Sequence, residues 1–140
     1  MNALIFPSVL ALMDAPESWN THIASLPVPI AGVHYDIGDG EFVPSTMLSP
    51  DDISFLSEAL SVDVHLMVRK PSAYFEKILS FPAVSAVAFH VECDEDIHET
   101  IQTLRNAGKK VGLALLDTTP AEYLDPYIQE IDYVLIMTVK

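Results

Sequence analysis

The stretch VHYDIGDGEFVP (residues 33–44) starts as an apolar run and gains ionisable side chains toward its end. In an extended strand, residues two apart lie on the same face, so His34 and Asp36 project together while Tyr35 projects to the other side. The Asp-Gly pair at 39–40 is typical of a turn. The stretch therefore predicts a strand with two polar side chains on one face, followed by a loop.

Similar apolar, β-branched runs recur along the chain, separated by segments with helical spacing. This alternation is the pattern of successive βα units on a parallel sheet. With the run IAGVHYDI (30–37), which overlaps the opening stretch, six strands are expected. The other five runs are ALIFPSVLAL (3–12), SVDVHLMV (61–68), SAVAFHVE (85–92), KVGLALLD (110–117) and DYVLIMTV (132–139).

Capping residues mark the expected helices between these runs. Ser49 and Pro50 predict the start of a helix that carries Ile53, Leu56 and Leu60, and Thr119, Pro120 and Glu122 have the spacing of a capping box. Trp19, Ile23 and Leu26 keep the spacing of a first helix, while Ile97, Ile101 and Leu104 predict one that stops at Gly108. The acidic run 92–99 is interpreted as the N-terminus of that helix rather than as a metal site.

Two architectures can hold six parallel strands, an open doubly wound sheet and an eightfold (β/α) barrel. The length of 140 residues favours the open sheet. The polar pairs favour the barrel, because its strand ends converge where active sites of that fold are built, whereas an open sheet would press them against a helix layer. The pairs and triplet expected on one face are His34 with Asp36, His65 with Met67, His90 with Glu92, and Leu135 with Met137 and Val139.

Composition limits the classes of partner and the compartment. There are 20 acidic and 7 basic residues, a formal charge of −13, which disfavours nucleic acid and anionic membrane surfaces. Cys93 is the single cysteine, so no intramolecular disulfide can form and a reducing compartment is expected. The N-terminal apolar run is too short and too interrupted to span a membrane. We expect one domain over residues 1–140 and a cytoplasmic location.

Histidine and aspartate side chains on adjacent strands form a donor set that is typical of a divalent-cation site. Neutral imidazole and carboxylate suit Zn²⁺, Fe²⁺, Mn²⁺ or Co²⁺, and three protein ligands leave a position for a substrate oxygen. His34, Asp36 and His65 are the predicted ligands of one such ion. Each could instead be a hydrogen-bonded core residue, and Met67 and Met137 could be core filler.

The same runs resemble the strand motifs of the ribulose-phosphate 3-epimerase family, in the family's order and over essentially the whole chain. The resemblance implies a (β/α)₈ TIM barrel, here truncated after about the sixth strand. The motifs for strands two and three are the most specific of the set. The matching segments are FPSVL (6–10), VHYD with DGEFVP (33–36 and 39–44), DVHLMV (63–68), FHVE (89–92), VGLAL (111–115) and LIMTV (135–139).

The resemblance implies a metal-assisted isomerase that interconverts D-ribulose 5-phosphate and D-xylulose 5-phosphate in the pentose phosphate pathway, commonly as a homo-oligomer. It implies that His34, Asp36 and His65 are the metal ligands and that Asp36 also acts as one of two acid/base carboxylates. It further implies that Ser8 and His65 contact the small-molecule sugar phosphate and that Met67 and Met137 line its site.

The chain departs from the family pattern at several positions. Gly38 stands where the family has a methionine, which predicts a missing soft wall and extra room. Glu41, Ser45 and the pair 116–117 also differ from the family pattern. A related sugar phosphate, such as allulose 6-phosphate, is therefore an alternative substrate. The family continues beyond the matched motifs to a second catalytic aspartate and the phosphate-binding loops, so we expect a fragment of a longer enzyme or a truncated relative. A non-catalytic doubly wound binding module or inactive paralogue is the remaining alternative.

Overall fold

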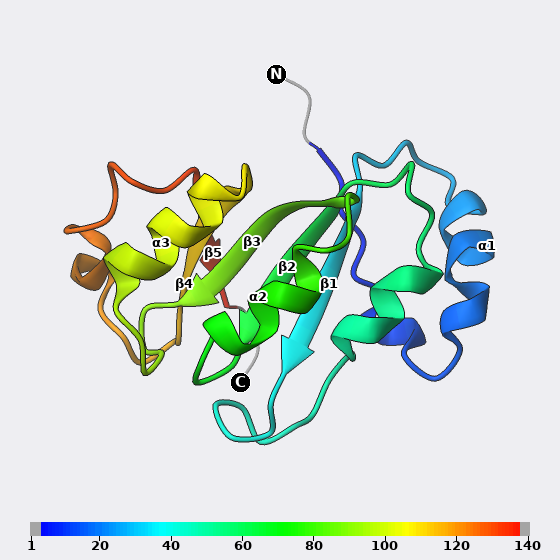
Figure 1. Ribbon diagram of the computed structural model, residues 1–140. Helices are drawn as coiled ribbons and strands as arrows, with labels where there is room; N and C mark the ends of the chain where they lie inside the picture. Colours follow the sequence, from blue (N-terminus) through cyan, green and yellow to red (C-terminus); the bar gives the residue numbers. More distant parts are fainter. Residues whose placement is uncertain (1–3, 138–140) are drawn as a thin grey trace.

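The structure, a computed structural model, describes residues 4–137. Within them, parallel strands form one five-stranded sheet in which each strand hydrogen-bonds to the next along the chain (Figure 1). A doubly wound sheet needs a point where the strand order reverses, and this order never does. The doubly wound alternative is therefore wrong, and the topology is that of part of a (β/α)₈ barrel. The strands are β1 (Val33–Gly38), β2 (Val62–Met67), β3 (Val84–His90), β4 (Lys110–Leu115) and β5 (Tyr133–Ile136).

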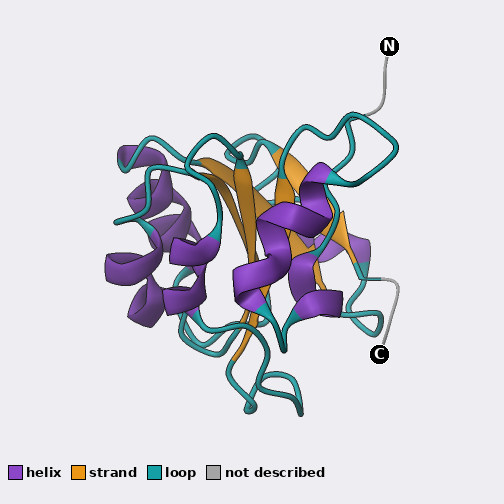
Figure 2. Ribbon diagram, turned by 90° about the vertical axis from the view of Figure 1, so that its right-hand side faces the viewer, coloured by secondary structure: helices purple, strands orange, loops and turns teal. Residues whose placement is uncertain are grey.

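Helices fill the connections between the strands. Figure 1 shows α2 and α3 in front of the sheet, and the side view of Figure 2 shows helices stacked against the strands. The α-helices are α1 (Trp19–Ala24), α2 (Ser72–Ile78) and α3 (Ile97–Asn106), and the 3₁₀ helices are η1 (Val9–Leu12), η2 (Pro16–Ser18), η3 (Pro50–Phe55) and η4 (Ala121–Leu124).

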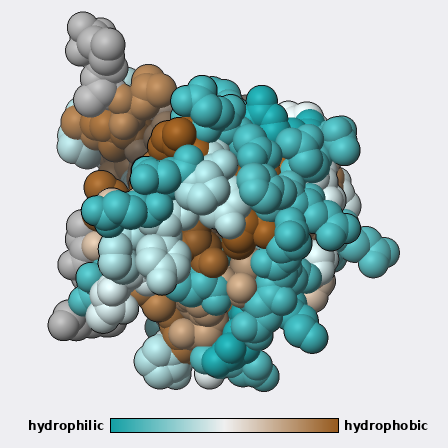
Figure 3. Space-filling model, turned by 90° about the vertical axis from the view of Figure 1, so that its left-hand side faces the viewer, coloured by the Kyte–Doolittle hydropathy of each residue, from teal (hydrophilic) through white to brown (hydrophobic). Residues whose placement is uncertain are grey.

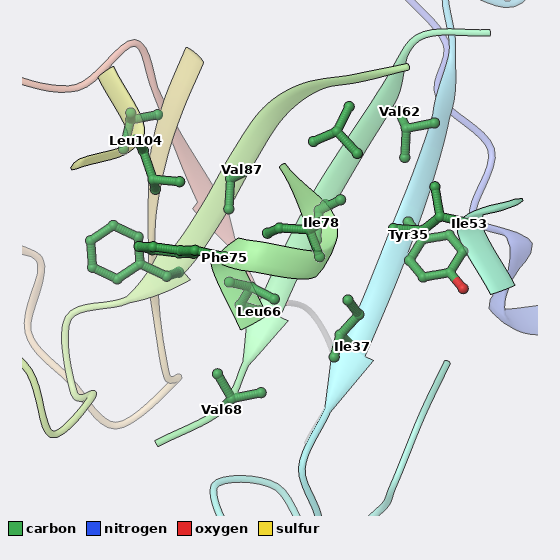
Figure 4. Close-up of a cluster of buried hydrophobic side chains, with 14 of the residues drawn as sticks. Tyr35, Ile37, Ile53, Val62, Leu66, Val68, Phe75, Ile78, Val87 and Leu104 are labelled. Carbon is green, nitrogen blue, oxygen red and sulfur yellow. The ribbon is translucent and has the colours of Figure 1, made fainter. Parts of the chain in front are cut away.

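The main apolar core lies between the helices and one face of the sheet (Figure 4). Tyr35 and Ile37 of β1, Leu66 of β2 and Ile78 of α2 all belong to it, and each is at most 1% exposed. Full burial of each large apolar side chain contributes roughly 1.5–3 kcal/mol. Because side chains alternate along a strand, this packing commits the intervening residues of β1 and β2 to the opposite face.

The first predicted strand, residues 3–12, is wrong over most of its length. Its described part makes a single parallel bridge, from Ser8 to His34, and then turns into η1. Pro7 accepts a hydrogen bond from the backbone N–H of His34 at 2.9 Å but has no N–H to return. Ser8 instead caps η1 by accepting from the backbone N–H of Leu10 at 3.2 Å, so the ladder ends there.

The helix predicted from Ser49 is shorter and tighter than expected. Ser49 does accept from the N–H of Asp51, but the segment is the 3₁₀ helix η3, which ends before Leu60. Asn20 of α1 explains the end, because its side chain donates to the carbonyl of Phe55 at 2.7 Å and accepts from the N–H of Ser57 at 3.0 Å. These two bonds satisfy backbone groups that a longer helix would have paired internally.

Of the remaining helix predictions, one is confirmed and two need correction. Asp96 caps α3 by accepting from the N–H of Glu99 at 2.9 Å, and Gly108, with φ of 75°, follows its end. The capping box at Thr119 is wrong: η4 begins after Pro120 and has no side-chain cap. The first helix stops at Ala24, before Leu26.

The other strand predictions are confirmed, and of the last one Thr138 and Val139 lie outside the described residues. Figure 3, seen from the left-hand side of Figure 1, shows hydrophilic residues over one half of the view and apolar residues surfacing mainly in the other. Exposed apolar side chains include Leu4 at 76% and Ile136 at 79%. None of the described helices is both long and apolar enough to cross a membrane.

Candidate metal centre

Two histidines and an aspartate meet where β1 and β2 approach their ends. Asp36 pairs with His65 across the two strands, and His34 lies two residues earlier on the same face. Asp36 Oδ1 is 3.1 Å from His34 Nε2 and 3.1 Å from His65 Nδ1. One donor atom from each of the three residues lies within 4.8 Å of the others. The structure thus brings the predicted ligands together, while their role as ligands stays a prediction.

Ser8 completes the surroundings of Asp36. Its Oγ donates to Asp36 Oδ2 at 2.9 Å, so the two carboxylate oxygens face different groups. The parallel bridge between Ser8 and His34 holds the N-terminal segment in place for this contact. Asp36 is only 9% exposed, and its one hydroxyl and two imidazole partners offset the cost of burying a carboxylate.

A second carboxylate supports His34 from the other side of its ring. His34 Nδ1 is 3.3 Å from Asp63 Oδ2, and Asp63 Oδ1 accepts from the hydroxyl of Tyr133 at 2.5 Å. Tyr133 of β5 reaches Asp63 of β2 across β4 and β3. Gly112 of β4 makes room for its ring, because a Cβ on Gly112 would lie 2.5 Å from two ring carbons. Sequence reasoning assigned no role to Asp63, Tyr133 or Gly112, because only the strand register brings them together.

His65 also continues into a buried polar chain. Its Nε2 lies 3.0 Å from Nε2 of His90, which is fully buried at the end of β3. His90 Nδ1 is 3.3 Å from Glu92 Oε2, and Glu92 Oε1 accepts from the backbone N–H of Leu116 at 3.0 Å. The predicted pairing of His90 with Glu92 is therefore present, although Glu92 lies beyond the last residue of β3.

The close packing of carboxylates and imidazoles shifts the pKa values of several of these groups. Burial alone would lower the pKa of His34, but hydrogen bonds and charge from Asp36 and Asp63 outweigh it and raise the pKa to about 9. Burial alone would raise the pKa of Asp36, yet hydrogen bonds from His34, His65 and Ser8 hold it well below its usual range. Burial and the neighbouring His65 lower the pKa of His90 to about 4. Without a cation, a protonated His34 faces an ionised Asp36.

The chemistry of these donors fits a divalent cation. When His34 Nδ1 carries a proton toward Asp63, a neutral His34 turns the lone pair of Nε2 toward Asp36 Oδ1. Two acceptors 3.1 Å apart repel each other unless a proton or a cation lies with them. Histidines whose other ring nitrogen is held by a carboxylate are the usual arrangement around protein-bound metals.

A cleft of about 420 Å³ opens directly onto the cluster. Of the predicted substrate contacts, His65, Met67 and Met137 line it, and Ser8 contacts Asp36 beside it. Leu135 lies on the same wall, as the spacing on the last strand predicted, and Val139 lies outside the described residues. The walls are mostly apolar, so polar ligand atoms would find their partners at the histidine and aspartate floor.

The extra room predicted at Gly38 is absent. A Cβ there would lie 2.8 Å from the carbonyl of Ser45, 3.0 Å from Val43 and 3.1 Å from the side chain of Met47. The loop after β1 therefore packs onto the glycine, and Met47 brings a thioether to the cleft. The flexible thioether wall that a methionine at position 38 would provide comes instead from Met47, nine residues further along the chain. No local sequence signal indicates this replacement.

Comparison with known proteins decides the family. The sequence model of the ribulose-phosphate 3-epimerase family matches residues 5–140. The chain belongs to this family. Ribulose-phosphate 3-epimerase of Rhodobacter capsulatus is 36% identical over 110 residues, which are 77% of this chain and 48% of the relative. The enzyme of the same name from Escherichia coli K12 is 32% identical over 140 residues, 98% of this chain and 61% of the relative.

The chain spans about half the length of the curated relatives it matches. The Treponema pallidum ribulose-phosphate 3-epimerase, 36% identical over 110 residues, is covered to 50%. The described part of this family member comprises the strands β1 to β5 and the histidine and aspartate cluster. Family membership agrees with the resemblance of the strand motifs, and the barrel-type strand order agrees with both.

Proposed function

We propose that this chain is part of a metal-dependent sugar-phosphate epimerase that inverts C3 of D-ribulose 5-phosphate to give D-xylulose 5-phosphate, the pentose phosphate pathway reaction. The observation that carries the proposal is Asp36, whose Oδ1 is shared by two histidines at the floor of the cleft. Metal analysis of the purified chain is a direct first check of this site. Membership in the epimerase family supplies the class of substrate.

His34, Asp36 and His65 would hold one divalent cation, Zn²⁺, Fe²⁺, Mn²⁺ or Co²⁺. When bound, the cation supplies electrostatic stabilisation of the negative charge that develops on the substrate oxygens. Asp63 and His90 keep the outer ring nitrogens of the two histidines occupied. The inner nitrogens are therefore free to face the cleft.

Asp36 is the proposed acid/base group. Its low pKa keeps the carboxylate ionised, so it is in the state that can accept a proton. The C3–H bond of the substrate breaks, the proton moves to Asp36 Oδ2, and the electron pair moves into the neighbouring carbonyl. Ser8 Oγ, 2.9 Å from Oδ2, holds that oxygen in position. By analogy with the family, the acid that returns a proton to the opposite face would come from a segment beyond the described strands.

The thioether walls have a proposed role of their own. Met47, Met67 and Met137 line the cleft without offering a proton to exchange. An apolar wall excludes water, which protects the deprotonated sugar from stray protonation. Because thioethers are flexible, they adjust to a sugar that changes configuration at one carbon.

The base assignment is tested by isotope exchange. D-ribulose 5-phosphate is incubated in D₂O with the chain and each of the four metals, and the C3 proton is followed by NMR. We expect metal-dependent loss of the C3 signal with the native chain and no exchange with Asp36→Asn. The matched control is Asp94→Asn, a surface carboxylate paired with Arg69, which should exchange at the native rate. Equal exchange by Asp36→Asn, or none by a chain that has bound metal, overturns the assignment.

Allulose 6-phosphate remains the alternative substrate. The loop that packs on Gly38 removes the extra room that favoured a larger sugar, so we expect faster exchange with the five-carbon substrate. The same NMR assay with both sugars decides between them. Assembly into a homo-oligomer, a cytoplasmic location and the lack of nucleic acid or membrane partners stay predictions.

A further inference from the structure

His90 and Glu92 are ionisable groups that the proposed reaction does not use. His90 is fully buried, and both of its ring nitrogens have partners: Nε2 faces His65 Nε2 at 3.0 Å and Nδ1 faces Glu92 Oε2 at 3.3 Å. Glu92 Oε1 is in turn fixed by the backbone N–H of Leu116 at 3.0 Å. A line of polar contacts therefore runs from Asp36 through His65 and across β3 to the end of β4.

The direction of these hydrogen bonds follows from counting donors and acceptors. Glu92 has only acceptor oxygens when ionised, so His90 Nδ1 carries the proton that lies between them. A neutral His90 then has a lone pair on Nε2 and accepts from His65. His65 then carries its proton on Nε2, and its lone pair is on Nδ1, the atom 3.1 Å from Asp36 Oδ1, where a bound cation would take the place of the hydrogen bond between these two residues. Two charged imidazolium rings in this buried contact would repel each other.

We propose that His90, oriented by Glu92, is a positioning residue that fixes the tautomer and the ring orientation of His65 so that Nδ1 faces the cation. The inference rests on the proposed metal site. Phe42 packs on His90 with ring centroids 4.8 Å apart and so limits the movement of the His90 ring. Without His90, the His65 ring could turn and present either nitrogen.

The two metal-ligand histidines are thus held in different ways. His34 is held by Asp63 directly, whereas His65 is held by Glu92 only through His90. Loss of one such outer partner usually weakens metal binding about 10- to 100-fold. A buried aromatic of similar size would preserve packing at residue 90 but could not accept a hydrogen bond, so the two roles can be separated by substitution.

The test is a Co²⁺ titration of the full 140-residue chain, followed by the visible absorption of the ion, beside NMR of ¹⁵N-labelled histidine. We expect His90→Phe to weaken Co²⁺ binding about 10- to 100-fold and to change the absorption spectrum. His90→Gln keeps an acceptor for His65 and a donor for Glu92, so it should restore most of the affinity. In the native chain loaded with Zn²⁺, the NMR should show the proton of His65 on Nε2 and the ion at Nδ1.

The matched control is His98→Phe, which removes a histidine that also contacts a carboxylate, Glu130, but lies on α3 away from the cleft. It should leave Co²⁺ affinity and spectrum unchanged. Native affinity in a folded His90→Phe variant, or zinc bound through Nε2 of His65, overturns the positioning role alone. Failure of the native chain to bind Co²⁺ at all overturns the proposed function together with it.

Discussion

Replacement of Gly112 by alanine tests how much the packing of Tyr133 over Gly112 contributes to holding β5 in the sheet. The new Cβ would lie 2.5 Å from Cε2 and Cζ of Tyr133, whereas carbon atoms in contact sit about 3.5–4.0 Å apart. The ring must move by about 1 Å, but its hydroxyl is held by Asp63 at 2.5 Å. Overpacking of this kind costs about 1–3 kcal/mol, and the gain from replacing a glycine offsets at most about 0.4–1 kcal/mol.

The expected result is a Gly112→Ala chain with a free energy of unfolding lower by about 1–2 kcal/mol. Urea denaturation followed by the fluorescence of Trp19, which is fully buried, measures the change. The same substitution should cost under about 0.5 kcal/mol in a Tyr133→Leu background, where no ring stands over the strand. In a Tyr133→Phe background the ring remains, so most of the cost should remain. Equal costs in the tyrosine and leucine backgrounds would show that the clash is not the cause.

The remaining predictions concern pH and two helix ends. With metal removed by a chelator, the NMR signal of His34 should titrate near pH 9. The stability that its ion pairs contribute is fully present below pH 6.5 and should be lost as the pH rises from 6.5 through about 9. Asn20→Ala should lower the free energy of unfolding by about 1 kcal/mol and speed amide exchange at Ser57, because two hydrogen bonds are lost. Asp96→Ala should lower it by about 0.5–2 kcal/mol through loss of the cap at Glu99, measured by thermal denaturation.

Each of these predictions has a matched control. Asp63→Asn should lower the titration midpoint of His34, and an unchanged midpoint would contradict the role given to that carboxylate. Asn20→Asp keeps the acceptor for Ser57 but loses the donor to Phe55, so it should retain part of the stability. Asp96→Ser keeps a capping oxygen and should stay close to the native chain. A larger loss with serine than with alanine would refute the capping argument.

The sequence by itself determined the parallel βα pattern and the face on which the site lies. Alternation of apolar and polar residues along β1 and β2 is a local property, and it placed His34 and Asp36 on one face and Tyr35 on the other before any contact was known. The helix start in the acidic run 92–99 and the stop at Gly108 are local as well, because the groups that satisfy both ends of α3 lie within about one turn of those ends.

Only the tertiary structure decided the rest, because the interactions concerned join residues far apart in the chain. The first predicted strand shrank to a bridge at Ser8 because Pro7 lacks a donor, and η3 ends where Asn20 reaches across from α1. The contacts of Asp63 with Tyr133 and of Met47 with Gly38 follow from register and loop packing, which no periodicity encodes. The sequence determined which side chains share a face, and the packing determined which of them touch.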